Sequence, residues 1–358
     1  MKKKLVGMLA TATLLTMALS GNVQAAEIRS VGPDGEAAVD ASTIELTDDQ
    51  IAQIKEGGYT AAICLHYGGN DWSTSQQKGL EDTFGELGIE IVAVTDANFS
   101  AETQVSNIET VMAKKPDILV SIPTDATATA DAYKQAAAAG IKIVFMDQRA
   151  DGLEAGKDYV SVVSADNYGN GYASGTVLGD ALGGKGKVAM VYYYANFAPT
   201  NQRDEGFRDA MKNYPDIEIV TEQGFTDESG CAEQGDAILT QFPNIDGIYA
   251  SWDVPMEGVL SAVRAAGMEG KVTLACNDLG NNVAREIASG NIAGGGAQMP
   301  YDQGVAEAKL AALALLGEET PSYVAVPAET VTHENVLEAY TDVYHVETPD
   351  WLKEAYVE

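Results

Sequence analysis

From residue 60 onward the sequence alternates short apolar runs with longer amphipathic segments. The first apolar runs are TAAICL (60–65), IEIVAVT (89–95), DILVSI (117–122) and IKIVFM (141–146). Strands that are apolar on both faces are typical of parallel sheets covered by helices on each side. Because connections between parallel strands are right-handed, this series predicts a doubly wound α/β sheet.

The same pattern starts again after residue 167. Later strands are predicted in the runs KVAMVYYY (187–194), IEIVTEQ (217–223), DGIYAS (246–251) and KVTLAC (271–276). The repetition is one of pattern and not of matching letters. A chain of 358 residues is long enough to bury two separate cores. We therefore predict two doubly wound, Rossmann-like parallel-sheet lobes.

The chain begins with MKKKLVGMLATATLLTMALSGNVQA, in which three lysines precede an apolar stretch and small residues. This arrangement is typical of a secretory signal peptide, and we predict residues 1–25 as that signal. The apolar stretch is too short for a comfortable membrane span. The mature protein is therefore expected in a bacterial periplasm.

The composition is acidic and poor in cysteine. A formal net charge of −31 disfavours nucleic acid and anionic lipid as partners. Three widely spaced cysteines, Cys64, Cys231 and Cys276, do not form a disulfide framework. Cys64 and Cys276 stand in apolar runs, which predicts buried thiols. A bridge between Cys231 and Cys276 remains open at this stage.

Polar and aromatic residues gather where the predicted strands end. In open α/β sheets, ligands bind in the crevice outside the carboxyl ends of the strands. Two of the three tryptophans stand at such ends, one in each half of the chain. The candidate residues read from these positions are Asn70, Trp72, Asp147, Gln148 and Arg149 in the first half, and Thr226, Trp252, Asp278 and Gln298 in the second.

These residue types suit a sugar or polyol. Carboxylates accept hydrogen bonds from hydroxyl groups, guanidinium groups donate in a fork, and amides do both. Indole rings cover the apolar C–H faces of such a ligand with a large, rigid surface.

Simpler roles compete for several of the same residues. Ser73, Asp125 and Asp278 stand just before predicted helices, where they would serve as N-caps. Asp147 and Arg149 would also make a surface ion pair, and a single tryptophan usually packs in a core. The clustering at strand ends in both halves favours the binding interpretation.

Seven short motifs resemble the ribose-binding branch of the type I periplasmic sugar-binding proteins. They occur in that family's order: GNDW (69–72), IPTD (122–125), FMDQR (145–149), SADN (164–167), QRDEGF (202–207), YASWD (249–253) and GAQMP (296–300). The resemblance implies two lobes joined by a three-segment hinge, with the ligand between them. It also implies a monomer that delivers its ligand to the membrane permease of an ABC transporter.

The resemblance also suggests how the chain divides. We expect an N-terminal extension at 26–59 and a first lobe made of 60–165 plus 299–330. The second lobe is then 166–298 plus 331–345, followed by a polar tail at 346–358 that wraps the surface.

Roles follow from the resemblance residue by residue. Asn70 and Asp147 look like hydroxyl-binding residues of the first lobe, and Trp72 occupies the place of an aromatic that flanks the sugar ring. Arg203, Asp278 and Gln298 look like the hydrogen-bonding residues of the second lobe.

Several positions depart from the family pattern. Ile122 replaces a pocket Asn. The family has an Arg directly after Asp147, whereas this chain has Gln148 there and Arg149 one place later. Ser73 and Thr226 replace aromatic residues. Trp252 stands where an Asn is expected. The departures predict a ligand other than D-ribose, such as a different pentose, a hexose, a deoxy sugar or a sugar alcohol.

An enzyme is a weaker interpretation. The sequence has no GxGxxG at the first helix and no GxSxG, and His66, His333 and His345 are far apart. No residues have metal-ligand spacing. We therefore predict no catalytic residue, metal or cofactor, and expect His66 to pack beside the cleft.

Two other classes of binding protein are alternatives to a transport protein. A transcription repressor would need a basic helix-turn-helix in place of the signal peptide, and we reject it. A sensory receptor that presents a sugar-like signal to a chemoreceptor or sensor kinase stays open as an alternative.

Overall fold

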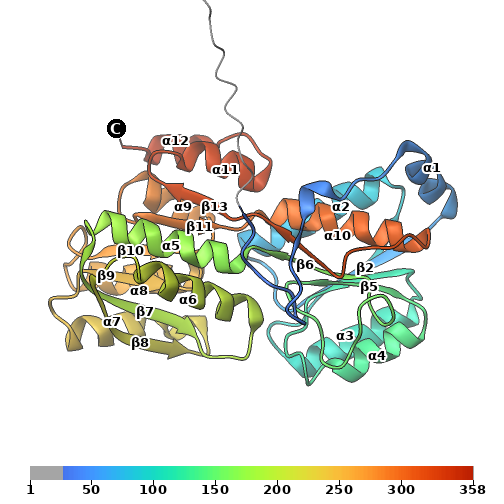
Figure 1. The fold of residues 1–358 in the computed structure, drawn as a ribbon, viewed down its shortest axis with the longest axis horizontal. Helices are drawn as coiled ribbons and strands as arrows, with labels where there is room; N and C mark the ends of the chain where they lie inside the picture. The colour runs from blue at the N-terminus through green and yellow to red at the C-terminus, as the bar shows by residue number, and fades with distance from the viewer. Residues whose placement is uncertain (1–26, 358) are drawn as a thin grey trace, which may run out of the picture.

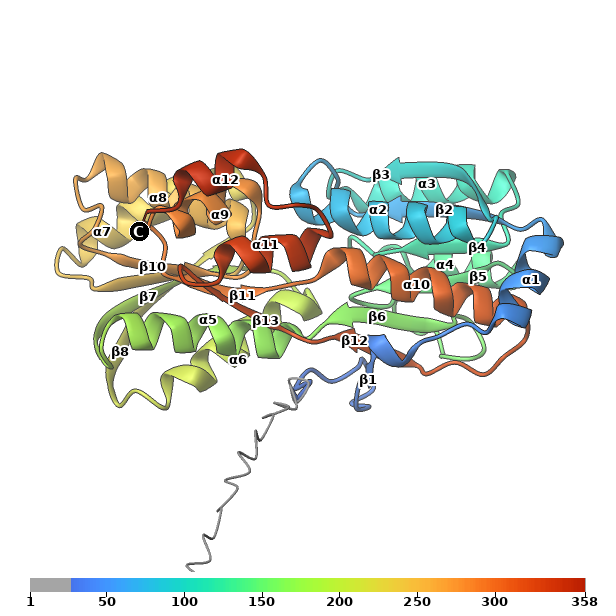
Figure 2. The same ribbon diagram turned by 90° about the horizontal axis from the view of Figure 1, so that it is seen from above.

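Residues 27–357 are described by a computed structural model, and they form two lobes that lie side by side (Figure 1). Each lobe is built on one sheet covered by helices on both faces, as the view from above also shows (Figure 2). The predicted α/β fold with two doubly wound sheets is confirmed. The predicted signal peptide at 1–25 lies outside the described residues.

The sheet of the first lobe has seven strands, all parallel. In spatial order they are β1 (Val39–Asp40), β12 (Tyr323–Val326), β6 (Ser161–Ala165), β5 (Lys142–Met146), β4 (Ile118–Ser121), β2 (Thr60–Leu65) and β3 (Glu90–Asp96). The side chains of successive residues of a strand point to opposite faces of the sheet. For example, Ile63 packs in the apolar cluster on one face and Cys64 in the cluster on the other. This explains why the strands are continuously apolar.

The sheet of the second lobe has six strands. In spatial order they are β13 (Glu329–Thr332), β11 (Gly294–Ala297), β10 (Thr273–Cys276), β9 (Gly247–Ala250), β7 (Lys185–Tyr193) and β8 (Asp216–Phe225). Only β13, at the edge, runs antiparallel to its neighbour, β11. All three cysteines are buried and free, so the predicted buried thiols are confirmed and no Cys231–Cys276 bridge forms.

Helices cover both faces of each sheet. In the first lobe, α2 (Asp71–Glu86) and α10 (Pro300–Leu315) cover one face, and α3 (Ala101–Ala113) and α4 (Ala130–Ala138) cover the other. In the second lobe, α5 (Asn167–Ala181) and α6 (Ala198–Met211) face one side. The opposite side carries α7 (Cys231–Gln241), α8 (Asp253–Ala265), α9 (Asn281–Ala288) and α11 (Val336–Tyr344). Within residues 27–357, no helix has the length and apolar character needed to cross a membrane.

The chain passes between the lobes three times. It leaves the first sheet after β6, returns after β11, and leaves again after β12. The first two expected boundaries, after residues 165 and 298, fall in these connections. The third, after residue 330, falls inside β13, whose pairing with β11 already includes Glu329. That crossing therefore comes before Glu329.

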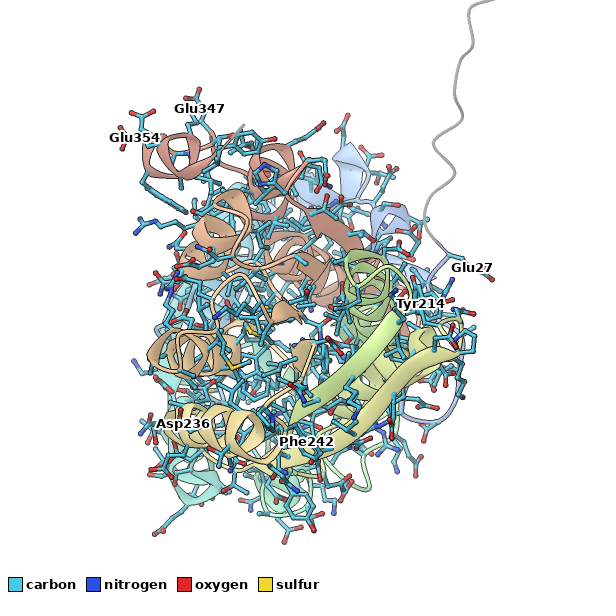
Figure 3. All side chains as sticks on the ribbon, turned by 90° about the vertical axis from the view of Figure 1, so that its left-hand side faces the viewer. Glu27, Tyr214, Asp236, Phe242, Glu347 and Glu354 are labelled. Atoms are coloured by element: carbon cyan, nitrogen blue, oxygen red, sulfur yellow. The ribbon has the colours of Figure 1, made fainter. Side chains whose placement is uncertain are left out.

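The two ends of the described chain pack more closely than we expected. In the extension, β1 adds an edge strand to the first sheet by pairing with β12, and α1 (Asp48–Gly57) begins with a capping box made by Thr47 and Gln50. In the tail, α12 (Asp350–Ala355) inserts Leu352, fully buried, into the core of the second lobe. Glu347 and Glu354 point outward at this end of the molecule (Figure 3). The tail is thus partly core and not only a surface wrapping.

The contact between α2 and α10 depends on the absence of a side chain at Gly79. A Cβ atom there would clash with the backbone carbonyl of Tyr301, whereas a Cβ at Gly85 on the same helix meets nothing within 4 Å. We predict that Gly79→Ala lowers the free energy of unfolding by about 1–3 kcal/mol through overpacking. Gly85→Ala should raise it, by up to about 1 kcal/mol, because alanine favours the helix. Urea unfolding of both variants checks this, and equal effects would contradict it.

Candidate functional site

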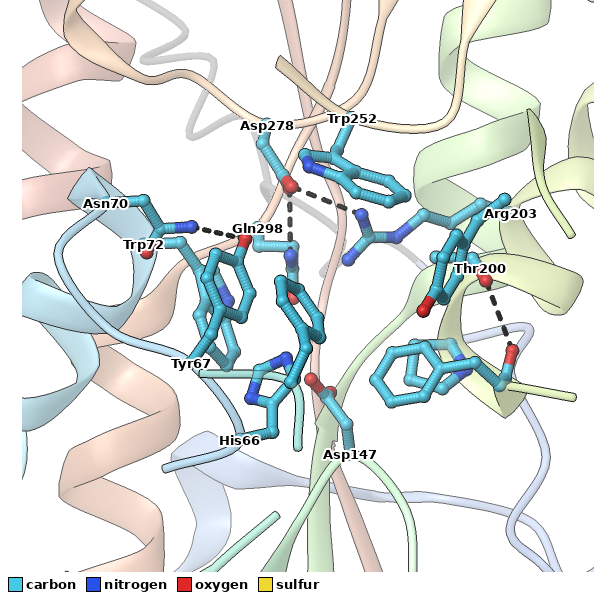
Figure 4. A pocket seen from close by; sticks show the side chains of 14 residues that line it. His66, Tyr67, Asn70, Trp72, Asp147, Thr200, Arg203, Trp252, Asp278 and Gln298 are labelled. Carbon is cyan, nitrogen blue, oxygen red and sulfur yellow. Dashed lines mark hydrogen bonds and ion pairs between the residues drawn. The ribbon is translucent and has the colours of Figure 1, made fainter. Parts of the chain in front are cut away.

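A cavity of about 50 Å³ lies between the lobes, outside the carboxyl ends of strands from both sheets (Figure 4). The first lobe lines it with His66, Tyr67, Asn70, Trp72, Phe99 and Asp147. The second lobe and the crossing before α10 line it with Tyr193, Phe197, Pro199, Thr200, Arg203, Trp252, Asp278 and Gln298. Seven of the ten predicted residues are therefore brought together in one cavity.

The turn after β2 places Asn70 and Trp72. Gly69 has a φ of 87°, a conformation that glycine adopts without a steric cost. Asn70 then caps α2, because its Oδ1 accepts from the backbone N–H of Ser73 at 2.8 Å. Its Nδ2 donates to the Tyr67 hydroxyl. The N-cap of this helix is thus Asn70 and not Ser73, and much of the Asn70 amide is already used within the first lobe.

In the second lobe, Arg203 and Asp278 form a buried ion pair. Nη1 of Arg203 lies 3.1 Å from Oδ2 of Asp278 and 3.3 Å from the carbonyl of Ser251, and Nε donates to Oδ1 of Asn167 at 2.8 Å. Gln298 donates to the other oxygen of Asp278 at 2.8 Å. Figure 4 shows Arg203, Asp278 and Gln298 joined in this order. Asp278 caps no helix, since the N-cap of α9 is Gly280.

Asp147 faces these groups from the first lobe. It follows β5 directly and has a φ of 54°, which is uncommon for a residue other than glycine. Oδ1 accepts from the hydroxyl of Ser164 at 2.8 Å. Burial raises the pKa of Asp147, although the bond from Ser164 opposes the shift. The residue is therefore a buried acceptor at the cavity wall.

Aromatic rings make up much of the remaining wall. His66 contacts Trp72 edge to face and stacks with Phe197, each at 5.8 Å between ring centroids, and Tyr67 stacks on Phe99 at 4.2 Å. Burial lowers the pKa of His66 to about 3, so the imidazole is neutral and packs beside the cleft, as expected.

On the second lobe, Tyr193 and Phe225 pack against Trp252. The Nε1–H of Trp252 donates to Glu228 at 2.8 Å. This bond fixes the plane of the indole ring that lines the cavity, and Trp252 therefore presents a defined face to a ligand.

Besides His66, six lining residues were not among the predicted site residues: Tyr67, Phe99, Tyr193, Phe197, Pro199 and Thr200. Phe99 stands in the loop after β3, another carboxyl strand end, so the rule that found the other candidates also covers it. Tyr67 directly follows His66 at the end of β2. Tyr193 is the last residue of β7, where an aromatic residue looks like core.

Three predicted residues do not line the cavity. Gln148 is buried between the lobes, where it donates to the carbonyl of Pro123 and accepts from the N–H of Ala198. Arg149 turns away to pair with Asp34 of the extension at 2.8 Å. Thr226 is exposed in the turn after β8. The structure therefore does not bring these three predicted residues to the cavity.

The match to a family covers most of the chain. Residues 61–319 match the family model of the periplasmic binding protein domain. The chain therefore belongs to the periplasmic binding protein family, and the resemblance read from its motifs is confirmed.

Two curated relatives illustrate the similarity. The ribose import binding protein of Salmonella typhimurium is 24% identical over 272 residues, which cover 76% of this chain and 90% of the relative. The D-ribose/D-allose-binding protein of Pseudomonas aeruginosa is 29% identical over 273 residues, which cover 73% and 83%.

Two solved structures share the fold. A periplasmic solute-binding protein of an ABC transporter from Actinobacillus succinogenes, with bound D-allose, has a TM-score of 0.72 and 29% identity, covering 78% of this chain and 99% of its own. A solute-binding protein from Agrobacterium vitis, bound with alpha-D-tagatopyranose, has a TM-score of 0.74 and 25% identity, covering 82% and 100%.

Asp204, next to Arg203 on α6, makes stability depend on pH. It is buried and accepts from the hydroxyls of Ser251 and Tyr249, and burial raises its pKa from 3.8 to about 7. The folded state binds this proton more tightly than the unfolded state, so stability is lost as pH rises from about 4 to about 7.

We predict that Asp204→Asn reduces this loss. Urea unfolding at about pH 5 and about pH 8 should show a smaller difference in the variant than in the wild type. Asp209→Asn is the control, because that carboxylate is only half-buried on the same helix and its pKa is lowered, first by Lys212 and then by Tyr168. An unchanged pH dependence in Asp204→Asn would contradict the assignment.

Proposed function

We propose that this protein captures a sugar or sugar alcohol between its two lobes in the periplasm and delivers it to the permease of an ABC transporter. The observation that carries the proposal is the convergence of Arg203, Asp278 and Gln298 from one side and Asp147 and Trp72 from the other on a single cavity. The bacterial relatives that import ribose or bind D-allose support the same ligand class.

The cavity offers the hydrogen-bonding groups that a polyhydroxylated ligand needs. Trp72 Nε1 and Gln298 Oε1 are buried without a hydrogen-bond partner among the described residues. The Nη2 atom of Arg203 likewise has no partner in that part of the chain. Buried polar groups are normally paired. Hydroxyls that both donate and accept would pair all three, and an apolar ligand would pair none.

The energies are sufficient for tight binding. A hydrogen bond to a charged group contributes roughly 1.5–3 kcal/mol net. A few such bonds from Arg203, Asp278 and Asp147, together with ring contacts, reach the ~8 kcal/mol of a micromolar dissociation constant. Trp72 and Trp252 supply the apolar surface for the C–H faces of the ligand.

Binding requires the lobes to separate and close again. At about 50 Å³, the cavity is far smaller than the ~300 Å³ at the lower end of small-molecule pockets. The lobes are also bonded directly, because Asp71 of α2 accepts from the backbone and side-chain N–H groups of Asn281 of α9, both at 2.8 Å. A ligand that contacts both lobes favours the closed arrangement through its differential affinity.

The ligand class is tested by a thermal-shift panel of monosaccharides and polyols. A ligand at a hundred times its dissociation constant adds ~2.7 kcal/mol to stability. We predict that Arg203→Lys weakens the binding of the active compound by roughly tenfold to a hundredfold, because the second donor of the fork is lost. Arg149→Lys is the matched control, since Arg149 lies outside the cavity, and calorimetry should show its affinity unchanged. If no compound stabilises the protein, or both variants bind as the wild type does, the proposal fails.

Closure is tested by removing the direct bond between the lobes. We predict that Asp71→Ala shifts the ligand-free protein toward an open form, with a larger radius of gyration in small-angle scattering. Affinity should fall by roughly fivefold to 150-fold, because two hydrogen bonds of about 0.5–1.5 kcal/mol each are lost. Glu81→Ala is the control, because Glu81 is exposed on the same helix and bonds only to Gln77 of that helix. An unchanged scattering profile in Asp71→Ala would remove this bond from the closure mechanism.

A further inference from the structure

The charges around the cavity do not balance. Of the residues that the structure describes, Asp147 and Asp278 are the carboxylates that line the cavity, and Arg203 is the one guanidinium. Arg203 is already committed to Asp278 at 3.1 Å. The donors to Asp147, the Ser164 hydroxyl and the Gln303 amide, are both neutral. Among residues 27–357, no Lys, Arg or His nitrogen lies within ion-pair distance of Asp147, which is only 8% exposed.

The groups behind the wall do not supply the missing positive charge. The buried carboxyl of Asp253 and the half-buried one of Glu228 stand behind Trp252. Glu307, fully buried behind Asp147, is a further carboxyl with a pKa held well above its usual value by burial. The pKa of Tyr67, which lines the cavity, is raised first by burial and then by Glu228, Asp253 and Asp278, and Arg203 acts against them. The groups behind the wall are therefore carboxyls, and Arg203 is the charged group that acts in the opposite sense on both Tyr67 and Asp147.

The rings of the wall suit the same kind of charge. The faces of Trp, Tyr and Phe attract a cation within about 6 Å, by roughly 0.5–2 kcal/mol depending on how far it is desolvated. Trp72, Tyr67 and Phe197 line the cavity together with Asp147, and Figure 4 shows the Trp72 and Tyr67 rings and the Asp147 carboxylate at its wall. A carboxylate without a cation at ion-pair distance, in a cavity walled largely by rings, is an arrangement that can hold an ammonium group.

We infer that the natural ligand is a polyhydroxylated amine, an amino sugar or amino polyol, whose ammonium group lies at Asp147 among the rings. This inference rests on the proposed function and names its substrate class. The hydroxyls of the ligand meet Arg203, Asp278 and Gln298 across the cavity. A neutral sugar would give Asp147 only further neutral donors beside Ser164 and Gln303, and an anionic one would be repelled by it. A simple alkylammonium ion would leave the unpaired atoms of Arg203 and Gln298 without partners.

The test uses matched pairs of compounds that differ only in an amine or a hydroxyl. The pairs are D-glucosamine and D-glucose, D-galactosamine and D-galactose, D-mannosamine and D-mannose, and 1-amino-1-deoxysorbitol and sorbitol. Thermal shift and calorimetry are run at about pH 6, where such an amine is protonated. We expect at least one amine to bind about tenfold or more tightly than its neutral partner, a factor that corresponds to ~1.4 kcal/mol.

The variant Asp147→Asn separates charge from shape. It keeps the size and an acceptor oxygen but removes the negative charge, so the amine should lose its advantage over the neutral compound. Asp125→Asn is the control, because Asp125 follows the neighbouring strand β4, is exposed, and accepts only from Thr127 and Ala128. The preference should persist there.

Three outcomes would overturn the inference. If the neutral compounds bind as tightly as the amines, or if Asp147→Asn keeps the preference, the ligand is not recognised by its charge, while the proposed capture of a sugar or polyol stands. If neither these compounds nor the wider panel of sugars and polyols stabilises the protein, both proposals fail together.

Discussion

The guanidinium of Arg203 is the group on which the arrangement of the cavity depends. It is 4% exposed and bonds to Asn167 at the first crossing, to the carbonyl of Ser251 after β9, and to Asp278 after β10. A buried charge is costly unless it is paired and hydrogen-bonded, and removing one partner of such a set is strongly destabilising. Three separate segments are therefore held where this one side chain needs acceptors. The position of the crossing and the shape of the second lobe's wall are fixed by the same constraint.

A second constraint acts on the backbone at both carboxylates of the cavity. Asp147 has a φ of 54° and follows the parallel strand β5, and Asp278 has a φ of 70° and follows the parallel strand β10. A left-handed residue that is not glycine costs about 1–3 kcal/mol and persists only where its surroundings determine it. The Ser164 hydroxyl at Asp147, and Arg203 with Gln298 at Asp278, supply those surroundings. The strain in one lobe thus matches the strain in the other, and both strained residues face the same cavity.

The sequence predicted those parts of the structure that depend on local pattern. Continuous apolar runs predicted the parallel strands, and the rule for carboxyl strand ends found Asp147, Trp252 and Asp278, because topology alone brings such positions to one edge. Prediction from the sequence failed where a residue distant in the chain decides the orientation of a side chain. Arg149 follows β5 as expected, but Asp34, 115 positions away, draws it out of the cavity. Tyr67 was missed because an aromatic residue at the end of an apolar strand has the same pattern as a core residue.

The same long-range pair determines the charge of the cavity. Asp34 belongs to the extension, and the backbone N–H groups of Arg29 and Ser30 in that segment bond to Asp166 at the first crossing, at 3.0 and 2.8 Å. With Arg149 held outside, Asp147 has no cationic nitrogen at ion-pair distance among the described residues, and Arg203 faces it from across the cavity. Rings alone would not compensate a cationic ligand for losing its water, because a buried charge needs a close counter-charge as well. The carboxylate and the aromatic wall are therefore effective only together, and the extension contributes to that pairing although it contributes no residue to the cavity.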